Sequence, residues 1–180
     1  MTAAQLELLK YPIGKFSLPE RISAETRLEW IQNLKELPAT LRSLTEDLSD
    51  GQLDTKYRPE GWTVRQLVHH IADSHTHAVM RFKWALTEDH PTIKTYNEKL
   101  YAELPDSNFS PIEPSLKQLD GLHERLIFLL NHLEEADFSR SFLHPDSGAN
   151  VSVLKMCGLY SWHGRHHCAH IEHLGKRKDW

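Results

Sequence analysis

Four stretches of the chain repeat apolar residues at the spacing of an amphipathic α-helix. They cover residues 24–50, 63–87, 115–135 and 152–174. No stretch alternates with the period of a strand over more than a few residues. Four such helices in 180 residues predict an all-α fold, a four-helix bundle with a long connection between its second and third helices. We expect one domain over residues 1–180.

Capping signals indicate where two of these helices begin. Thr63 is followed three residues later by Gln66, which is the spacing of a capping box. Ser115 and Gln118 have the same spacing at the start of the third stretch. Pro38 lies inside the first stretch and predicts either one bent helix or two short ones.

The segments outside these stretches lack a clear pattern. Residues 1–21 are rich in proline and glycine, which favours an extended lead-in. Residues 136–150 are expected to form a loop, and Gly175 to stop the last helix. The long connection over residues 88–113 is typical of a lid, or of a crossover that simply joins two helices.

Composition limits the classes of partner. The net charge is -4 with histidines neutral and no basic patch is evident, so we expect no nucleic acid partner. No run approaches the roughly 18 apolar residues that span a bilayer, so we expect no membrane contact. The N-terminus lacks the basic start and apolar run of a signal peptide, which predicts a cytoplasmic protein.

The histidines are concentrated in two short runs. Of the 13 in the chain, nine lie in these runs: His69, His70, His75, His77, His163, His166, His167, His170 and His173. Neutral imidazole is the commonest side-chain metal ligand. We therefore predict that the two runs meet in space and bind one divalent metal ion.

Helical spacing narrows the choice of ligands. On a helix, His163 and His167 lie one turn apart near the middle of the apolar stripe, so both rings can reach one ion. The competing pair at the same spacing is His166 with His170. In the earlier run, His69 and His70 flank the apolar stripe on opposite sides, and periodicity alone does not choose between them. A single histidine on such a face is more often an ordinary core residue than a ligand.

Several motifs together resemble the YfiT group of the DinB-like superfamily, a group of metal-dependent hydrolases. The matching segments are Tyr11-Pro-Ile-Gly, Gly61-Trp-Thr-Val-Arg-Gln-Leu-Val-His-His-Ile-Ala-Asp-Ser-His75 and Trp162-His163 with His166-His167 and Ala169-His170. The resemblance runs from about Tyr11 to Trp180. It implies a homodimeric four-helix bundle that binds nickel or zinc through three histidines. By the positions of the motifs, these are His70, His163 and His167.

Three neutral ligands leave one position of a divalent ion open, which is the arrangement of catalytic zinc sites. Such an ion lowers the pKa of water from about 15.7 to about 7. The resulting hypothesis is metal-dependent hydrolysis of a small-molecule substrate. Two alternatives use the same ion differently: transfer of a low-molecular-weight thiol, and a non-catalytic, stress-related metal-binding dimer.

The sequence assigns no catalytic acid or base. Asp73 is a candidate for a residue that orients a ligand or takes a proton, and equally for a solvated acid on a helix surface. Three loop residues could cover the site and could equally be packing residues: Trp62, Tyr96 and Glu98. We expect His75 and His77 at the bundle surface or between subunits.

Overall fold

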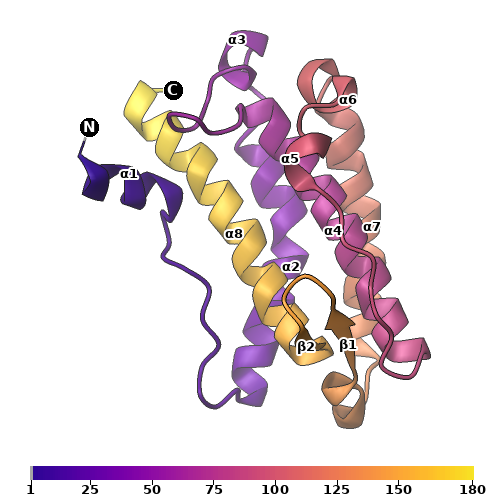
Figure 1. The fold of residues 1–180 in the computed structure, drawn as a ribbon. Coiled ribbons are helices and arrows are strands. Elements are labelled where there is room, and N and C mark those ends of the chain that lie inside the picture. Colours follow the sequence, from indigo (N-terminus) through magenta and orange to yellow (C-terminus); the bar gives the residue numbers. More distant parts are fainter. Residues whose placement is uncertain (1) are drawn as a thin grey trace.

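The computed structural model describes residues 2–180 as a bundle of four long helices (Figure 1). The four are α2 (Ala24–Ser43), α4 (Val64–Thr87), α7 (Glu113–Asn131) and α8 (Val153–Lys178). Helices α2 and α4 each pack against both α7 and α8. The predicted bundle and its long connection between α4 and α7 are therefore confirmed. None of the helices in residues 2–180 combines the length and the apolarity that crossing a bilayer requires.

The predicted helix starts are partly right. Helix α4 begins after Thr63, whose side chain and that of Gln66 form the expected capping box. The capping box predicted at Ser115 is wrong, because α7 already begins at Glu113 with Pro114 in its first turn. Ser115 is thus inside the helix, where its hydroxyl is free to bond to His69.

Helix α2 is continuous through Pro38, so the alternative of two short helices is wrong. A proline has no N–H to give to the carbonyl four residues before it, here that of Leu34. Helix α2 ends at Ser43, earlier than its apolar pattern suggested, and a short helix α3 (Asp50–Leu53) follows. Helix α8 runs through Gly175, which is therefore not a stop signal.

The N-terminal segment contains a helix that the sequence analysis missed. Helix α1 (Ala3–Lys10) starts at a capping box between Thr2 and Gln5, and the extended chain begins only after it. The connection between α4 and α7 holds two short helices, α5 (Glu98–Tyr101) and α6 (Pro105–Phe109).

A small hairpin replaces the loop that we expected before α8. After a 3-10 turn, η1 (Glu135–Ser139), strand β1 (Ser141–His144) pairs antiparallel with β2 (Ala149–Ser152). Phe142 lies opposite Val151, and both are buried. Strands of four residues are too short for their alternation to be recognised in the sequence.

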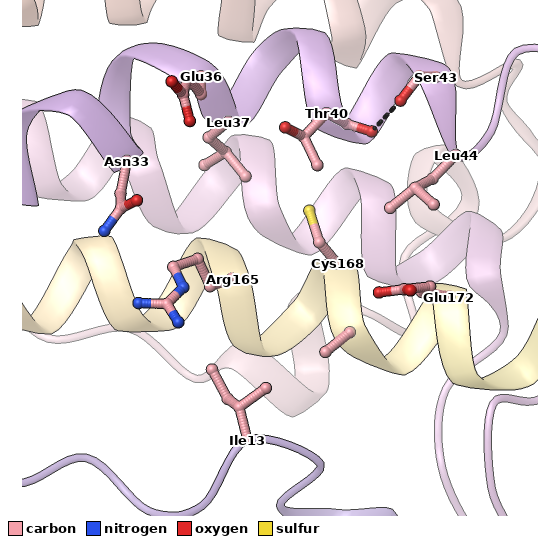
Figure 2. A pocket seen from close by; sticks show the side chains of 11 residues that line it. Ile13, Asn33, Glu36, Leu37, Thr40, Ser43, Leu44, Arg165, Cys168 and Glu172 are labelled. Carbon is pink, nitrogen blue, oxygen red and sulfur yellow. Dashed lines mark hydrogen bonds between the residues drawn. The ribbon is translucent and has the colours of Figure 1, made fainter.

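Helix α8 approaches α2 closely at a glycine. A Cβ atom at Gly164 would lie 2.6 Å from Cδ2 of Leu37, so any larger residue would displace that side chain. Beside this contact is a hollow of about 490 Å³ between α2 and α8 (Figure 2). Arg165 and Cys168 line the hollow, which contains none of the histidines. The face of α8 toward α2 therefore packs against that helix through Gly164, and the histidines of α8 do not line the hollow on this face.

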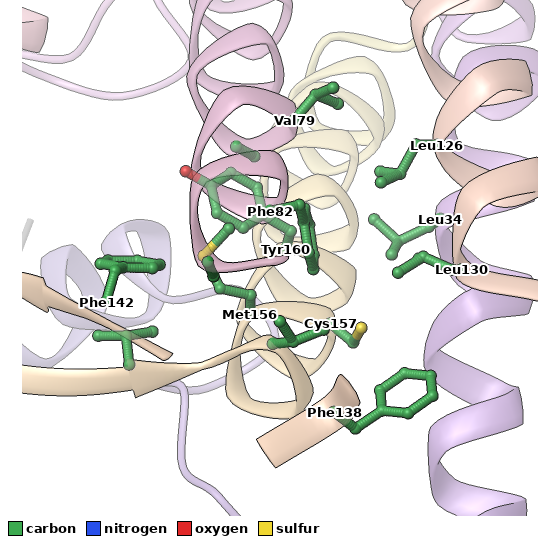
Figure 3. Close-up of a cluster of buried hydrophobic side chains, with 14 of the residues drawn as sticks. Leu34, Val79, Phe82, Leu126, Leu130, Phe138, Phe142, Met156, Cys157 and Tyr160 are labelled. Atoms are coloured by element: carbon green, nitrogen blue, oxygen red, sulfur yellow. The ribbon is translucent and has the colours of Figure 1, made fainter. Parts of the chain in front are cut away.

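The core consists of two clusters along the bundle. The cluster at the hairpin end joins Leu34, Phe82, Phe142 and Met156 (Figure 3). The second includes Leu67 of α4, with further members Leu37, Leu119 and Ile171. Burying one such side chain contributes about 1.5–3 kcal/mol. All four long helices contribute to this packing, which fixes the rotation of α4 and α8 and hence the direction of their histidines.

Candidate metal centre

Helices α4 and α8 bring one histidine of the first run and two of the second together. His70, His163 and His167 each offer a ring nitrogen, and these three atoms lie within 4.8 Å of one another. The ring of His70 is 5.4 Å from that of His163 and 5.0 Å from that of His167, between centroids. Within α8, the Nε2 atoms of His163 and His167 are 3.2 Å apart.

This spacing fits a common cation. Zinc–nitrogen bonds of about 2.0–2.1 Å at tetrahedral angles separate two ligand nitrogens by about 3.3 Å. The 3.2 Å between the Nε2 atoms of His163 and His167 is close to this separation. The three rings come from two helices, so the geometry of the donor set is fixed by the packing of α4 against α8.

The three imidazoles are neutral at physiological pH, as metal ligands must be. Burial lowers the pKa of His70 to about 4. Burial, reinforced by the neighbouring imidazoles, lowers the pKa values of His163 and His167 well below the ordinary value of 6.5. The residues present therefore suit a divalent cation such as zinc or nickel.

A backbone carbonyl begins a chain of hydrogen bonds that leads to this centre. The Leu34 carbonyl, which Pro38 leaves without its helical partner, lies 2.7 Å from Nδ1 of His123 on α7. A carbonyl can only accept, so Nδ1 of His123 must donate. His123 is buried, which lowers its pKa and keeps it neutral, so its Nε2 carries a lone pair.

The direction of the remaining hydrogen bonds follows from this start. Nε2 of His123 lies 3.0 Å from Nδ1 of His75, which must therefore donate. Nε2 of neutral His75 then accepts from Nδ1 of His163, 3.3 Å away. The result is that Nε2 of His163 presents its lone pair toward His167. We call His163, His75, His123 and the Leu34 carbonyl the imidazole relay.

The relay changes the interpretation of two histidines. His75 is only 1% exposed, so its predicted position at the surface or between subunits is wrong. It lies four residues before Val79 on the buried side of α4, and its ring is met by His123 from α7. The sequence does not mark His123 as a candidate, because a single histidine in a leucine-rich helix has no distinctive spacing.

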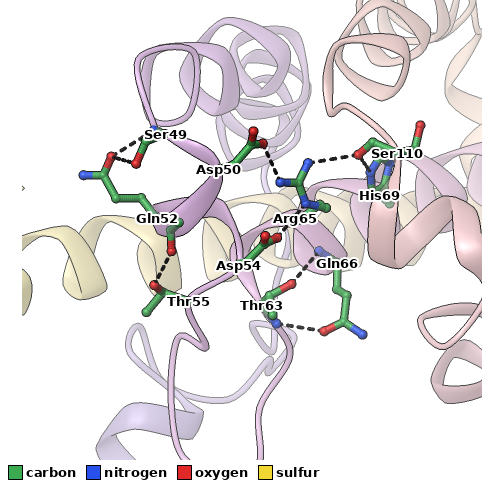
Figure 4. A network of polar contacts seen from close by, with 11 residues as sticks. Ser49, Asp50, Gln52, Asp54, Thr55, Thr63, Arg65, Gln66, His69 and Ser110 are labelled. Atoms are coloured by element: carbon green, nitrogen blue, oxygen red, sulfur yellow. Dashed lines mark hydrogen bonds and ion pairs between the residues drawn. The ribbon is translucent and has the colours of Figure 1, made fainter.

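His69 is not part of the three-histidine group, and Figure 4 shows it beside Ser110. Its Nδ1 lies 2.8 Å from the Ser115 hydroxyl, and its Nε2 lies 3.3 Å from the Ser110 carbonyl. Both nitrogens of His69 are thus occupied by hydrogen bonds that tie α4 to α7 and to the segment before it. Among residues 2–180, no such partner is found for His70, which leaves its ring available.

The competing pair on α8 forms a second possible group. Nε2 of His166 lies 3.1 Å from Nε2 of His170, and both can share a cation with His167. His166 stacks on Trp162 at 4.5 Å and His170 packs on Tyr57 at 4.2 Å, between centroids. Nδ1 of His166 and Nδ1 of His167 are both buried and have no hydrogen-bond partner in the described chain.

Two cavities meet at His163. One of about 820 Å³ is also lined by His70, His167 and Trp62, and the ring of Trp62 lies 4.6 Å from that of His70. The other, of about 700 Å³, extends from His163 along α4 and the α4–α5 connection. Glu98 lines both cavities. The centre therefore adjoins two cavities, and of its three imidazoles only that of His163 lines the smaller one.

Tyr96, His77 and Asp73, which the sequence also singled out, lie outside the three-histidine group. Tyr96 lines the smaller cavity and stacks at 4.1 Å on His77, which is partly exposed. Asp73 is half-buried, which raises the pKa of its carboxyl group, and it lines neither cavity. The structure thus gives Asp73 no contact with the centre.

The chain is similar to known proteins over most of its length. The family model described as the DinB superfamily matches residues 33–171, which include His70, His163 and His167. The chain belongs to the DinB superfamily. Two relatives within it, each named provisionally as a metal-dependent hydrolase, are of nearly the same length. The Oceanobacillus iheyensis protein is 50% identical over 171 residues, covering 95% of this chain and 98% of the relative. A Bacillus cereus protein is 51% identical over 172 residues, covering 96% and 98%.

A solved structure shares the fold as well. YfiT from Bacillus subtilis matches with a TM-score of 0.94 and 47% identity, covering 96% of this chain and 99% of that one. Its description calls it a probable metal-dependent hydrolase with an unusual four-helix bundle topology. The DinB-superfamily resemblance found in the sequence is thereby confirmed.

Proposed function

We propose that this DinB-superfamily protein is a metal-dependent hydrolase whose zinc or nickel ion is held by His70, His163 and His167. The observation that carries the proposal is the convergence of three neutral imidazoles at the point where two cavities meet. When bound by three neutral ligands, such an ion lowers the pKa of water toward about 7 and polarises a carbonyl or phosphoryl oxygen.

The chain's own residues prepare the site for this chemistry. The imidazole relay fixes the tautomer and the ring orientation of His163. The indole of Trp62 covers one side of His70 and limits the access of bulk water to that ring. Glu98, exposed at the edge of both cavities, is the carboxylate best placed to exchange protons with solvent.

The proposal is tested by elemental analysis of protein purified without a nickel column. Wild type should contain close to one zinc or nickel ion per subunit, and His167→Ala should contain almost none. The loaded and the metal-stripped protein are then compared on ester, amide and phosphate substrates, where only the loaded protein should turn over. Full occupancy in His167→Ala would contradict the ligand assignment.

The same assays separate the alternative functions. Adding a low-molecular-weight thiol to the loaded protein would yield a metal-dependent conjugate if the protein is an S-transferase. No turnover with any of these substrates would favour a non-catalytic metal-binding protein. We further propose a homodimer of single-domain subunits in the cytoplasm, which light scattering and cell fractionation would test.

A further inference from the structure

Helix α4 contains two buried arginines, and only one of them has a counter-ion. Arg65 is 5% exposed and its Nε and Nη2 donate to Asp54 and Asp50, each at 2.7 Å (Figure 4). Arg81 is 9% exposed and takes part in no ion pair among residues 2–180. Since a buried charge is costly unless it is paired, the isolation of Arg81 calls for an explanation.

The hydrogen bonds of Arg81 are also incomplete. Its Nη1 donates to the Tyr160 hydroxyl at 3.3 Å, which is a neutral and rather long contact. Its Nε is buried and has no partner in the described chain. A guanidinium has five N–H donors in a fixed fork, so most of the hydrogen-bonding capacity of Arg81 is unused.

Arg81 lies in the wall of the smaller cavity, on the same side of α4 as Ser74, and the cavity also reaches His163. Tyr160 lies between Arg81 and His163, because its hydroxyl bonds to Arg81 and its ring is 5.6 Å from the ring of His163, between centroids. The only acidic residues that line this cavity are Glu98 and Asp146, both exposed and neither within 4 Å of the guanidinium.

We propose that Arg81, with the Tyr160 hydroxyl, binds an oxyanion of the substrate, a carboxylate or a phosphate, while the reacting bond lies at the three histidines. A planar guanidinium pairs with two oxygens of either group through parallel N–H bonds. The substrate class is therefore a small anionic molecule whose charged group lies about one helical turn of α8 away from the scissile bond. Assigning the anion to a substrate rests on the proposed function, whereas anion binding itself does not.

Binding is measured by calorimetric titration of inorganic phosphate, and separately of acetate, into metal-stripped protein, so that the anion cannot bind to a metal. Wild type should bind at least one of the two, and the stronger one identifies the preferred oxyanion. Arg81→Gln should weaken this binding on the order of tenfold or more, because a charged hydrogen-bonded pair is lost. Arg81→Lys keeps the positive charge but lacks the planar fork of N–H donors, so its anion affinity should lie between those of wild type and Arg81→Gln.

The matched control is Lys83→Gln, which removes one positive charge from the same helix. Lys83 is exposed and lines a different groove, with Leu122 and Phe128, so its loss should leave anion affinity unchanged. Thermal melting of each variant reports folding independently. Arg81→Gln should melt at or above the wild-type temperature without anion and should lose the increase that anion gives to wild type.

Three outcomes would overturn the subsite: no anion binding by wild type, unchanged binding by Arg81→Gln, or equal weakening by Lys83→Gln. Failure of the proposed function looks different. A metal-loaded protein that hydrolyses nothing, but whose phosphate or acetate binding depends on Arg81, would refute the hydrolase and leave the anion subsite in place.

Discussion

Helix α8 contains two histidine pairs that are almost the same locally and differ in their surroundings. His163 with His167 and His166 with His170 share the i,i+4 spacing, and their Nε2 atoms are 3.2 Å and 3.1 Å apart. Burial lowers the pKa values of all four, so charge does not separate them. Local geometry on one helix therefore permits two chelating pairs.

The partners across the bundle distinguish the pairs. His163 and His167 are met by His70 from α4, and His163 is held by the imidazole relay. A metal-ligating histidine nearly always donates its second N–H to a partner, which orients the ring. Nδ1 of His166 and Nδ1 of His167 are both buried without a hydrogen-bond partner in the described chain, so only His163 of the four has such a partner. Tertiary contacts, rather than spacing, thus favour the first pair.

The comparison is tested most strongly by changing His163, one of the two residues, with His70, that belong to the first group alone. His163→Ala should lower metal affinity by more than about a hundredfold, since loss of an orienting partner alone costs about 10–100-fold. A competition titration against a chromogenic chelator measures this. Tight binding by His163→Ala, with loss in His166→Ala, would reverse the assignment of the two pairs.

The imidazole relay predicts the next largest effect. His123→Phe fills the space but leaves the Leu34 carbonyl and Nδ1 of His75 without partners, so His163 loses its fixed tautomer. We expect metal affinity to fall by about 10–100-fold and stability by about 1–3 kcal/mol. The chelator titration and urea unfolding measure these two quantities.

His132→Gln is the control for that variant, because His132 is the exposed C-cap residue of the same helix. The His132→Gln variant should keep the metal affinity and the stability of the wild type. A relay variant that binds metal as tightly as His132→Gln would show that His163 needs no support from α7.

The pH dependence of stability provides a third test. Burial lowers the pKa values of His75 and His123 in the folded state, whereas in the unfolded chain they are about 6.5. Above that pH neither state binds these protons, and below it the unfolded state binds more. The metal-free protein should therefore lose stability as pH falls below about 6.5, by up to about 1.4 kcal/mol per pH unit for each ring.

Urea unfolding at several pH values between 7 and 5 measures this slope. His123→Phe removes one of the rings that must stay neutral, so its slope should be shallower than that of the wild type. An equally steep slope in the variant would mean that the relay histidines do not contribute to acid sensitivity.

The smallest effect is expected for the second pair. His170→Ala removes a ring that packs on Tyr57 and belongs only to the second group. Its metal affinity should stay within about threefold of wild type, well below the 10–100-fold cost of losing an orienting partner. A hundredfold loss in the same chelator titration would show that the ion lies nearer to His166 and His170.

The contrast between local helix geometry and contacts across the bundle explains what could be predicted from the sequence. Helix α4 starts after Thr63, and α8 after Ser152, as capping and periodicity indicate, because those signals are local. The i,i+4 pairs on α8 are equally local. The resemblance to the DinB-like superfamily, not periodicity, selected His70 over His69, whereas the structure adds the hydrogen bonds that occupy His69.

What the sequence did not predict depends on contacts between distant segments. The imidazole relay joins α2, α7, α4 and α8, and each step depends on the rotation of one helix against another. The role of Leu34 arises only because Pro38 frees its carbonyl where His123 can reach it. Likewise, nothing in the sequence near Arg81 shows that it forms no ion pair with any carboxylate of residues 2–180.

The most direct test is a crystal structure of the zinc-loaded protein with anomalous diffraction data recorded at the zinc absorption edge. The account predicts one strong peak about 2.0–2.1 Å from Nε2 of both His163 and His167, and equally close to a ring nitrogen of His70. A peak between His166 and His170, or no ordered ion at any histidine, would contradict it.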